Sequence, residues 1–280
     1  MTGFHPLTRH GRWAMTGAAG NVGRHLRGAL AERFEHLLLL DTAEIRDCAP
    51  HESAVRADLR DFTLLREVLT GLDGIIHLGG IPDEADFHDL VDVNITGSFH
   101  VLESARINRV PRVVYASSNR ATGFYPTSRL VNPDLPVRPD GLYGVSKAAV
   151  EALGRLYADK FGLQVACLRI GSFEPAPSTP RELATWLSPD DCTRAFRAAL
   201  DADYGFITFY AVSDNRSGWW DLQAGRAIGF DPRDDAAAVG ARLDGTPAEP
   251  QGGDFASPGY TLSRQRHLSD GPTGAEEPQA

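Results

Sequence analysis

Short apolar runs alternate with segments of helical periodicity along the first 170 residues of the chain. Residues 13–16, 36–40, 54–57, 74–78, 112–116 and 164–170 are apolar runs of the length expected for strands. Between them, residues 22–30, 62–69, 87–107 and 143–161 carry apolar side chains at helical spacing, and Gly162 is placed to end the last helix. Strands that alternate with helices predict an α/β fold with a parallel, doubly wound sheet.

The pattern changes after residue 171. Pro175, Pro177 and Pro180 mark an irregular loop, after which residues 189–200 favour a helix and residues 206–212 a strand. From residue 247 onward Gly, Pro, Ser, Glu and Gln dominate, and periodicity is lost. We therefore expect a sheet domain at residues 12–172, a small substrate-binding cap at 173–246 and an extended or disordered tail at 247–280.

Composition narrows the possible partners of the protein. The 280 residues carry a formal net charge of -9, which argues against nucleic acid as a partner. No apolar run approaches the ~20 residues that span a bilayer, and the first 13 residues lack the apolar core of a secretory signal. We expect a cytoplasmic protein with a small-molecule substrate.

The cysteines and histidines give no sign of a metal site. Cys48, Cys167 and Cys192 are far apart in the sequence, and the nine histidines form no H-E-x-x-H pattern. We expect no metal and no disulfide framework, and we interpret the three cysteines as small buried residues.

A glycine-rich turn separates the first strand from the first helix. Gly17, Gly20 and Gly23 are three residues apart, and the absence of side chains lets a pyrophosphate approach the backbone and the helix N-terminus. Asp41 ends the second strand, where a carboxylate accepts hydrogen bonds from a ribose 2′-hydroxyl and repels a 2′-phosphate. This context predicts NAD rather than NADP. Asp58, after the third strand, could face the adenine or cap the next helix, and the sequence leaves both open.

Tyr143 and Lys147 are four residues apart at the start of a predicted helix, so their side chains share one helix face. An ammonium beside a phenol lowers the pKa of the phenol, which can then remove the proton of an alcohol. Ser118 follows the strand 112–116, at the edge where a doubly wound sheet binds ligands, and its hydroxyl could bind the reacting oxygen.

These motifs, T-G-A-A-G-N-V-G (16–23), S-S-N (117–119) and Y-G-V-S-K (143–147), resemble those of extended short-chain dehydrogenases/reductases, the NAD-dependent epimerase/dehydratase family. The resemblance implies a Rossmann domain at residues 12–172 and Ser118, Tyr143 and Lys147 as catalytic residues. It also implies that Lys147 contacts the nicotinamide ribose and that Asn94 lies beneath the cofactor. The implied cofactor-binding residues are Gly17, Ala19, Gly20, Asn21, Val22, Gly23, Asp41, Asp58, Leu59, Leu78, Gly79, Gly80, Asn94, Tyr143 and Lys147.

A narrower resemblance rests on H-L-G-G-I (77–81), S-S-N-R-A-T-G-F-Y-P (117–126), R-P-D-G-L-Y-G-V-S-K (138–147), R-I-G-S (169–172) and G-W-W-D (218–221). These segments are similar to uronate dehydrogenases. The similarity implies an oxidoreductase that converts the C1 hemiacetal of glucuronate or galacturonate to the aldarolactone with NAD⁺. It implies that Ser118, Asn119, Ser172 and Arg181 contact the sugar acid.

Two positions depart from the pattern of that group. Arg120 stands where the group has a histidine, and Pro82 stands where it has a serine. We expect Arg120 to join the substrate-binding residues and, with Arg181, to hold a carboxylate. The substrate could therefore be another anionic sugar or hydroxy acid.

Other functions use the same residues. A nucleotide-sugar epimerase or dehydratase would use the same three catalytic residues, although the short cap leaves little chain to hold a nucleotide. A non-catalytic NAD-sensing protein is the alternative from another class, and the intact Tyr143/Lys147 pair argues against it. The superfamily resemblance also suggests a homo-oligomer, a dimer or larger, through the two long helices. Trp219 and Trp220 could close over the site or pack the cap onto the sheet.

Overall fold

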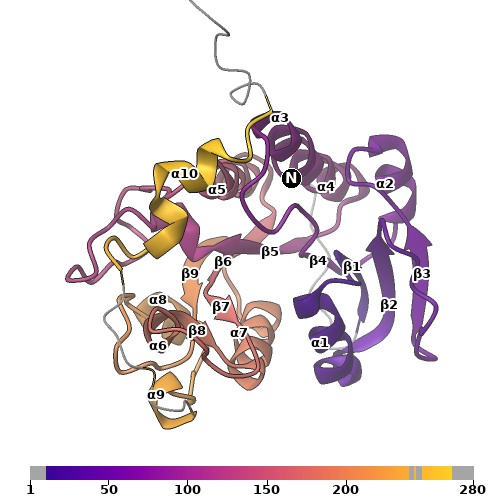
Figure 1. The fold of residues 1–280 in the computed structure, drawn as a ribbon. Helices are drawn as coiled ribbons and strands as arrows, with labels where there is room; N and C mark the ends of the chain where they lie inside the picture. Colours follow the sequence, from indigo (N-terminus) through magenta and orange to yellow (C-terminus); the bar gives the residue numbers. More distant parts are fainter. Residues whose placement is uncertain (1–10, 240–242, 244–247, 267–280) are drawn as a thin grey trace, which may run out of the picture.

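Seven parallel strands form the sheet at the centre of the protein (Figure 1). The computed structural model describes residues 11–239, 243 and 248–266. The strands are β1 (Gly11–Thr16), β2 (Phe34–Asp41), β3 (Glu52–Arg56), β4 (Gly74–His77), β5 (Arg112–Ser118), β6 (Gln164–Ile170) and β9 (Phe206–Ala211). Their order is β3-β2-β1-β4-β5-β6-β9, and every neighbouring pair is parallel. The predicted α/β fold with a doubly wound sheet is confirmed.

Helices cover both faces of this sheet (Figure 1). The helices α1 (Asn21–Ala29) and α7 (Pro189–Asp201) pack on one face, and α2 (Phe62–Val68), α4 (Gly97–Asn108) and α5 (Leu142–Phe161) pack on the other. The strands serve both cores because successive side chains point to opposite faces. Trp13 and Met15 therefore lie in the core under α1, whereas Ala14 between them lies in the core under α4.

The long helix predicted at residues 87–107 is continuous but not uniform. It begins as α3 (Phe87–Asp89), widens into the π-helical segment η2 (Leu90–Thr96) and continues as α4. Single π-helical turns inside helices often occur at functional sites. Here the segment contains Asn94, whose side chain binds the backbone of Ile81 just beyond β4.

Within the region predicted as a cap at residues 173–246, α7 and β9 belong to the sheet domain, and the shorter elements form a cap beside β9. They are β7 (Ser172–Phe173), α6 (Glu182–Thr185), β8 (Trp186–Leu187), α8 (Gln223–Ala227) and α9 (Ala236–Val239). Trp219 and Trp220 are buried in a separate apolar cluster with Tyr125, Val131 and Tyr210. The Trp220 ring stacks on Tyr210 with 5.2 Å between the ring centroids. The two tryptophans therefore pack the cap onto the sheet.

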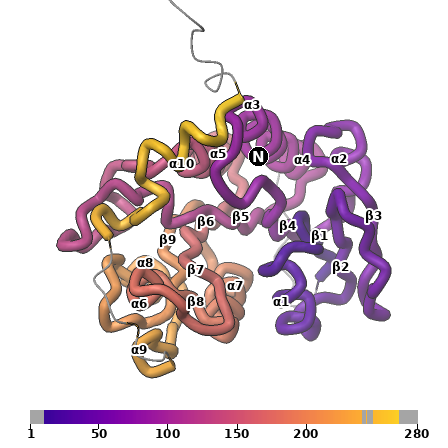
Figure 2. Tube along the Cα trace, viewed as in Figure 1, coloured from indigo at the N-terminus to yellow at the C-terminus, as the bar shows by residue number. Residues whose placement is uncertain are grey.

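The expectation of an extended or disordered tail from residue 247 is wrong for residues 248–266. This C-terminal segment contains the turn η4 (Gly253–Ala256) and the helix α10 (Pro258–Leu262), and it runs beside α5 (Figure 2). Gln251 anchors it by donating to the carbonyl oxygens of Pro126 and Arg129 at 3.0 and 2.9 Å. Polar contacts with distant segments fix this part of the chain, and such contacts leave no apolar periodicity. Residues 247 and 267–280 lie outside the described residues.

Three further properties concern the described part of the chain. None of its helices is both long enough and apolar enough to cross a membrane. It also holds no group of three or more His, Cys, Asp or Glu side chains arranged for a metal ion. Cys167 and Cys192 are buried, but Cys48 is exposed in the loop after β2, which corrects the interpretation of all three as buried residues.

Candidate active site

One large cavity follows the carboxyl ends of the strands, on both sides of the point between β1 and β4 where the strand order reverses. Ligands of doubly wound sheets bind at such a point. The cavity volume of about 1470 Å³ exceeds the 300–1,000 Å³ of ordinary ligand pockets. The sequence-predicted site residues that line it are Gly17, Ala19, Gly20, Asn21, Val22, Gly23, Asp41, Asp58, Leu59, Leu78, Gly79, Gly80, Ser118, Asn119, Arg120, Tyr143, Lys147, Ser172 and Arg181.

The glycine turn is packed so tightly that its first and last glycines have no room for a side chain. Gly17 has a φ of +68°, and a Cβ there would lie 2.6 Å from the backbone nitrogen of Gly79. A Cβ on Gly23 would lie 2.6 Å from the carbonyl oxygen of Gly17. Gly20 precedes α1 and provides no side-chain cap, so the first N–H groups of the helix can bind an anion in the cavity. This arrangement fits the pyrophosphate of a dinucleotide.

Asp41 and Asp58, the two predicted acidic residues of the cofactor site, have different partners. Asp41 accepts hydrogen bonds from the backbone N–H groups of Ala19 and Ala43, both at 2.9 Å, which fixes its carboxylate beside the glycine turn. Asp58 pairs with the exposed side chain of Arg60. The residue that caps α2 is Asp61, whose side chain accepts from the N–H of Leu64 at 3.0 Å. The helix-cap interpretation of Asp58 is therefore wrong, and Asp58 lines the cavity.

Asn94 lies behind the cavity wall and does not line it. It is 2% exposed, and its side chain accepts from the N–H of Ile81 at 2.7 Å and donates to the carbonyl oxygen of Ile81 at 3.1 Å. A third hydrogen bond, of 3.0 Å, joins Asn94 to the hydroxyl of Ser146 on α5. Asn94 thus fastens the chain after β4 to the helix that carries Tyr143.

Tyr143 and Lys147 lie one turn apart on α5 with their side chains buried against the end of β5. The Lys147 Nζ atom donates to the carbonyl oxygen of Ala116 at 2.9 Å and lies 5.5 Å from the centre of the Tyr143 ring. Burial lowers the pKa of Lys147 to about 8, and Glu151 one turn further along opposes that fall. Burial raises the pKa of Tyr143 to about 12, while a hydrogen bond with Ser118 and the charge of Arg120 oppose that rise.

His77 ends β4 close to this pair. Its ring nitrogens contact the hydroxyl oxygens of Thr16 at 2.6 Å and Ser98 at 2.9 Å. Burial, together with the charge of Lys147, lowers the pKa of His77 to about 3. The imidazole is therefore neutral at physiological pH, and the positive charges next to Tyr143 are Lys147 and Arg120, which lie 5.5 and 5.3 Å from the centre of its ring.

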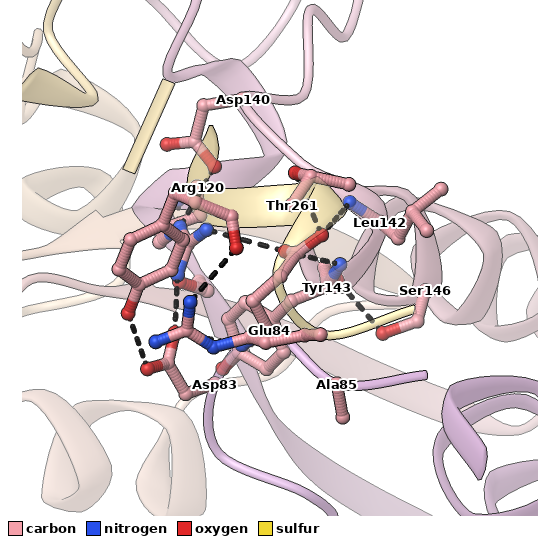
Figure 3. A network of polar contacts seen from close by, with 12 residues as sticks. Asp83, Glu84, Ala85, Arg120, Asp140, Leu142, Tyr143, Ser146 and Thr261 are labelled. Carbon is pink, nitrogen blue, oxygen red and sulfur yellow. Dashed lines mark hydrogen bonds and ion pairs between the residues drawn. The ribbon is translucent and has the colours of Figure 1, made fainter. Parts of the chain in front are cut away.

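Arg120 has partners that the sequence did not predict (Figure 3). It is 5% exposed, and its guanidinium pairs with Asp83 at 2.7 Å, Glu84 at 3.4 Å and Asp140 at 2.7 Å. Its central carbon also lies 4.3 Å from the centre of the Phe255 ring in the C-terminal segment. Three carboxylates thus already compensate its charge, which opposes the expectation that Arg120 helps to hold a substrate carboxylate.

Arg181 differs from Arg120 in its hydrogen-bond partners. Its Nε atom donates to the carbonyl oxygen of Gln251 at 2.8 Å, and its guanidinium lies 5.3 Å from the centre of the Phe255 ring. Among the described residues it forms no ion pair, although the charges of Asp140 and Glu182 act on it. Burial lowers the pKa of Arg181 to about 10, which leaves the group charged at neutral pH. Arg181 is therefore available to a ligand anion in the cavity.

The remaining sequence-predicted residues border the same space. Asn119 is buried next to Ser118, and Ser172 is half-buried with its hydroxyl 2.8 Å from that of Thr185. Pro82, one of the two departures, lines the cavity on the chain after β4.

Sequence reasoning missed the acidic residues around Arg120 and the contribution of the C-terminal segment. Asp83 and Glu84 follow β4 at the edge of the sheet where ligands bind, and this position was their one available signal. Phe255 and Tyr260 gave no signal, because they stand in a stretch without periodicity and enter the cavity wall through tertiary contacts.

Comparisons with known proteins agree with this geometry. Residues 13–202 match the family described as the NAD dependent epimerase/dehydratase family. The uronate dehydrogenase of Agrobacterium fabrum is 41% identical over 87% of this chain and 92% of the relative. The uronate dehydrogenase of Pseudomonas syringae pv. tomato is 38% identical over 86% and 88%.

A solved structure gives the same result. The mutant uronate dehydrogenase of Agrobacterium tumefaciens complexed with NAD superposes with a TM-score of 0.83 and 40% identity. The match covers 88% of this chain and 97% of that one. The chain belongs to the NAD dependent epimerase/dehydratase family, and its cofactor is NAD.

Proposed function

We propose that the protein oxidises the C1 hemiacetal of a uronic acid, glucuronate or galacturonate, to the aldarolactone with NAD⁺. The observation that carries the substrate class is Arg181, a guanidinium in the cavity wall without a carboxylate partner among the described residues. An arginine in this state favours a ligand with one carboxylate, which it can bind through two parallel hydrogen bonds. The relatives at 38–41% identity are uronate dehydrogenases, which supports the same substrate.

The residues that would hold the cofactor divide by the part they contact. The N–H groups at the start of α1 would bind the phosphates, and Asp41 would accept hydrogen bonds from the adenosine ribose. Leu59 and Asp58 would lie against the adenine, while Gly79, Gly80 and Lys147 would border the nicotinamide half. NAD⁺, when bound, supplies the acceptor for the hydride that leaves C1 with the two bonding electrons.

Tyr143 is the proton acceptor in this proposal. Ser118 and Tyr143 hydrogen-bond the C1 hydroxyl, and the Tyr143 phenolate takes its proton as the C1–H bond breaks and the C1 carbonyl forms. The phenol needs positive charge nearby, because burial raises its pKa to about 12. Lys147 at 5.5 Å and Arg120 at 5.3 Å from the centre of the ring provide that charge, and the charge of Arg120 opposes the rise of the Tyr143 pKa.

The experiment that tests the proposal measures NADH formation at 340 nm with a panel of substrates. The panel contains glucuronate, galacturonate, their neutral parent sugars, glucose 6-phosphate and simple hydroxy acids. We expect turnover with the uronates and little with the neutral sugars, which lack the carboxylate. Turnover of the phosphate ester in preference to both uronates would refute the substrate class and leave a dehydrogenase of another anionic sugar.

Replacement of the proposed anion ligand sharpens this test. Arg181→Met removes a charge-assisted pair worth roughly 1.5–3 kcal/mol, so kcat/KM for uronates should fall roughly 10- to 100-fold. The control is Arg155→Met, because Arg155 lies on the surface of α5 and pairs with Asp159. Equal kinetics in the two variants would show that Arg181 does not bind the substrate.

We also propose that the protein is a homo-oligomer, a dimer or larger, that associates through α4 and α5. These helices leave Phe99, Ile107, Val145, Leu156 and Phe161 exposed. Exposed apolar patches of this kind mark interfaces. Light scattering coupled to gel filtration tests the proposal, and a monomer of 30.4 kDa at micromolar concentration would contradict it.

A further inference from the structure

The helix that carries Tyr143 is capped by a residue from another segment. Gly141 precedes α5 and has no side chain to bind the first N–H groups of the helix. Glu84 takes that place: its Oε1 atom accepts from the N–H of Leu142 at 2.8 Å, and its Oε2 atom accepts from the N–H of Tyr143 at 3.0 Å. Figure 3 shows Glu84 pointing at these two nitrogens. The fit is close, since a Cβ on Gly141 would lie 2.4 Å from Glu84 Oε2.

The same carboxylate also binds the C-terminal segment. The Thr261 hydroxyl of α10 donates to Glu84 Oε1 at 3.0 Å, and Arg120 lies 3.4 Å from Oε2. The neighbouring residue is tied in the same way, because the Tyr260 hydroxyl donates to Asp83 Oδ2 at 2.5 Å. Each oxygen of Glu84 therefore has two donors, and its side chain is fully buried.

We propose that Glu84 is a positioning residue for Tyr143 and that, through Thr261, the C-terminal segment 248–266 takes part in this positioning. The first N–H groups of a helix have no partners within the helix, and an anion at this end stabilises it. Here one bidentate anion fixes the backbone of Leu142 and Tyr143. The phenol is thereby held against Ser118 and above Lys147. Misplacement of a reacting group by about 1 Å can cost roughly 100-fold in rate.

The contrast between a carboxylate and an amide makes the proposal testable. Glu84→Gln keeps the shape of the side chain but replaces one acceptor oxygen by an NH₂ group, which is a donor. Whichever way the amide turns, that donor faces at least one of the two backbone N–H groups. One of the two hydrogen bonds from Glu84 to the start of α5 is therefore lost, while Arg120 keeps Asp83 and Asp140 as partners.

The matched control is Asp86→Asn. Asp86 is a buried carboxylate two residues further along, and it caps α3 through the N–H of His88 at 3.0 Å. It also binds the C-terminal segment, accepting from the N–H of Arg266 at 2.9 Å. Among the described residues it forms no hydrogen bond or ion pair with α5, and it does not line the cavity. Asp86→Asn thus weakens the hydrogen bonds between the chain after β4 and the C-terminal segment, as Glu84→Gln does, but leaves the start of α5 unchanged.

The first readout is kinetic and uses the full chain with NAD⁺ and the uronate panel, so it depends on the proposed function. We expect Glu84→Gln to lower kcat roughly 10- to 100-fold with little change in the KM for NAD⁺. Thr261→Val should lower kcat roughly two- to fivefold, because it removes the hydroxyl that donates to Glu84 and leaves both hydrogen bonds between Glu84 and α5 in place. Asp86→Asn should keep the wild-type kcat. A Glu84→Gln enzyme within twofold of wild type, or an equal loss in Asp86→Asn, would overturn the positioning role.

The second readout needs no substrate. Amide hydrogen exchange of a peptide spanning residues 141–147 reports the hydrogen bonds of the Leu142 and Tyr143 N–H groups directly. We expect this peptide to exchange roughly fivefold faster in Glu84→Gln than in wild type, and at the wild-type rate in Asp86→Asn. Unchanged exchange in Glu84→Gln would also overturn the proposal. If the wild-type protein turns over no uronate, the proposed function fails, and exchange still decides whether Glu84 holds this helix.

Discussion

The two ends of the cavity are assembled in different ways. At the cofactor end, the contacts that shape the site involve the backbone at neighbouring strand ends, such as Ala19 with Asp41 across 22 positions and Gly79 with Thr16 across 63. At the sugar end, the contacts join distant segments: Glu84 with Tyr143 across 59 positions, Arg181 with Gln251 across 70, and Asp83 with Tyr260 across 177. The first end is built mainly from backbone at the ends of adjacent strands, and the second is an assembly of charged side chains from distant segments.

This difference separates cofactor binding from sugar recognition in physical terms. The cofactor end offers backbone N–H groups and a helix terminus, and these fit a pyrophosphate whatever the substrate is. The sugar end depends on which charges are compensated: Arg120 has three carboxylates, and Arg181 has a carbonyl oxygen. A change of one side chain at this end can alter the available charge without disturbing the glycine turn.

The largest expected effect on kcat is at Tyr143, which lies between the cofactor end and the sugar end of the cavity. Tyr143→Phe removes the proton acceptor and should lower kcat roughly 10²- to 10⁴-fold, while the affinity for NAD⁺ stays nearly the same. The matched control is Tyr157→Phe on the same helix, because that hydroxyl bonds Glu103 away from the cavity. Steady-state kinetics and NAD⁺ titration measure both variants. A Tyr143→Phe enzyme that retains most of its kcat would exclude Tyr143 as the base.

The next largest effect is expected from Arg120→Met, which tests whether the charged side chains at the sugar end depend on one another. Arg120→Met leaves Asp83, Glu84 and Asp140 without their shared cation, and we expect a loss of about 3 kcal/mol in the free energy of unfolding. We also expect a higher KM for the sugar, because Asp83 and Phe255 lose their common partner. Denaturant titration with and without NAD⁺ measures the stability.

The comparison variant for Arg120 lies at the other end of the molecule. Arg27→Met breaks a buried pair with Glu52 beneath the cofactor half, and it should cost stability without raising the KM for the sugar. If both variants raise this KM equally, the effect of Arg120 on the sugar site is no more than general destabilisation.

The smallest expected effect tests the cofactor end. Asp41→Ala removes the carboxylate that repels a 2′-phosphate, so the preference for NAD over NADP should fall roughly 10- to 100-fold. The control is Glu44→Ala, an exposed acid three residues further along that pairs with Arg46 outside the cavity. The ratio of kcat/KM for the two cofactors is the measurement, and an unchanged ratio would contradict the ribose role of Asp41.

Much of the fold could be predicted because its signals are local. The strand at residues 164–170 agrees with β6 at both ends, and the predicted helix stop at Gly162 is confirmed by its left-handed conformation, with a φ of +76°. The doubly wound sheet followed from the alternation of strands and helices. The π-helical turn around Asn94 did not, because a segment of seven residues is too short for its apolar spacing to separate a π-helix from an α-helix.

The candidate site divides in the same way. Gly17, Asp41, Tyr143 and Lys147 could be placed together because strand ends and helix spacing bring them to one edge of the sheet. Arg120 was misjudged because a sequence shows a charge but not the carboxylates that compensate it. The segment 248–266 was misjudged because its order comes from side-chain contacts more than 100 positions apart, such as Gln251 with Pro126.

The sequence by itself therefore determined the sheet, the NAD-binding turn and the pairing of Tyr143 with Lys147, since each depends on backbone geometry over a few residues. Tertiary structure alone decided which arginine is free to bind an anion, which carboxylate caps the catalytic helix, and which segment closes the sugar end. The physical reason is that hydrogen bonding and charge compensation depend on the distance between atoms in space. Residues far apart in the chain acquire that distance through folding.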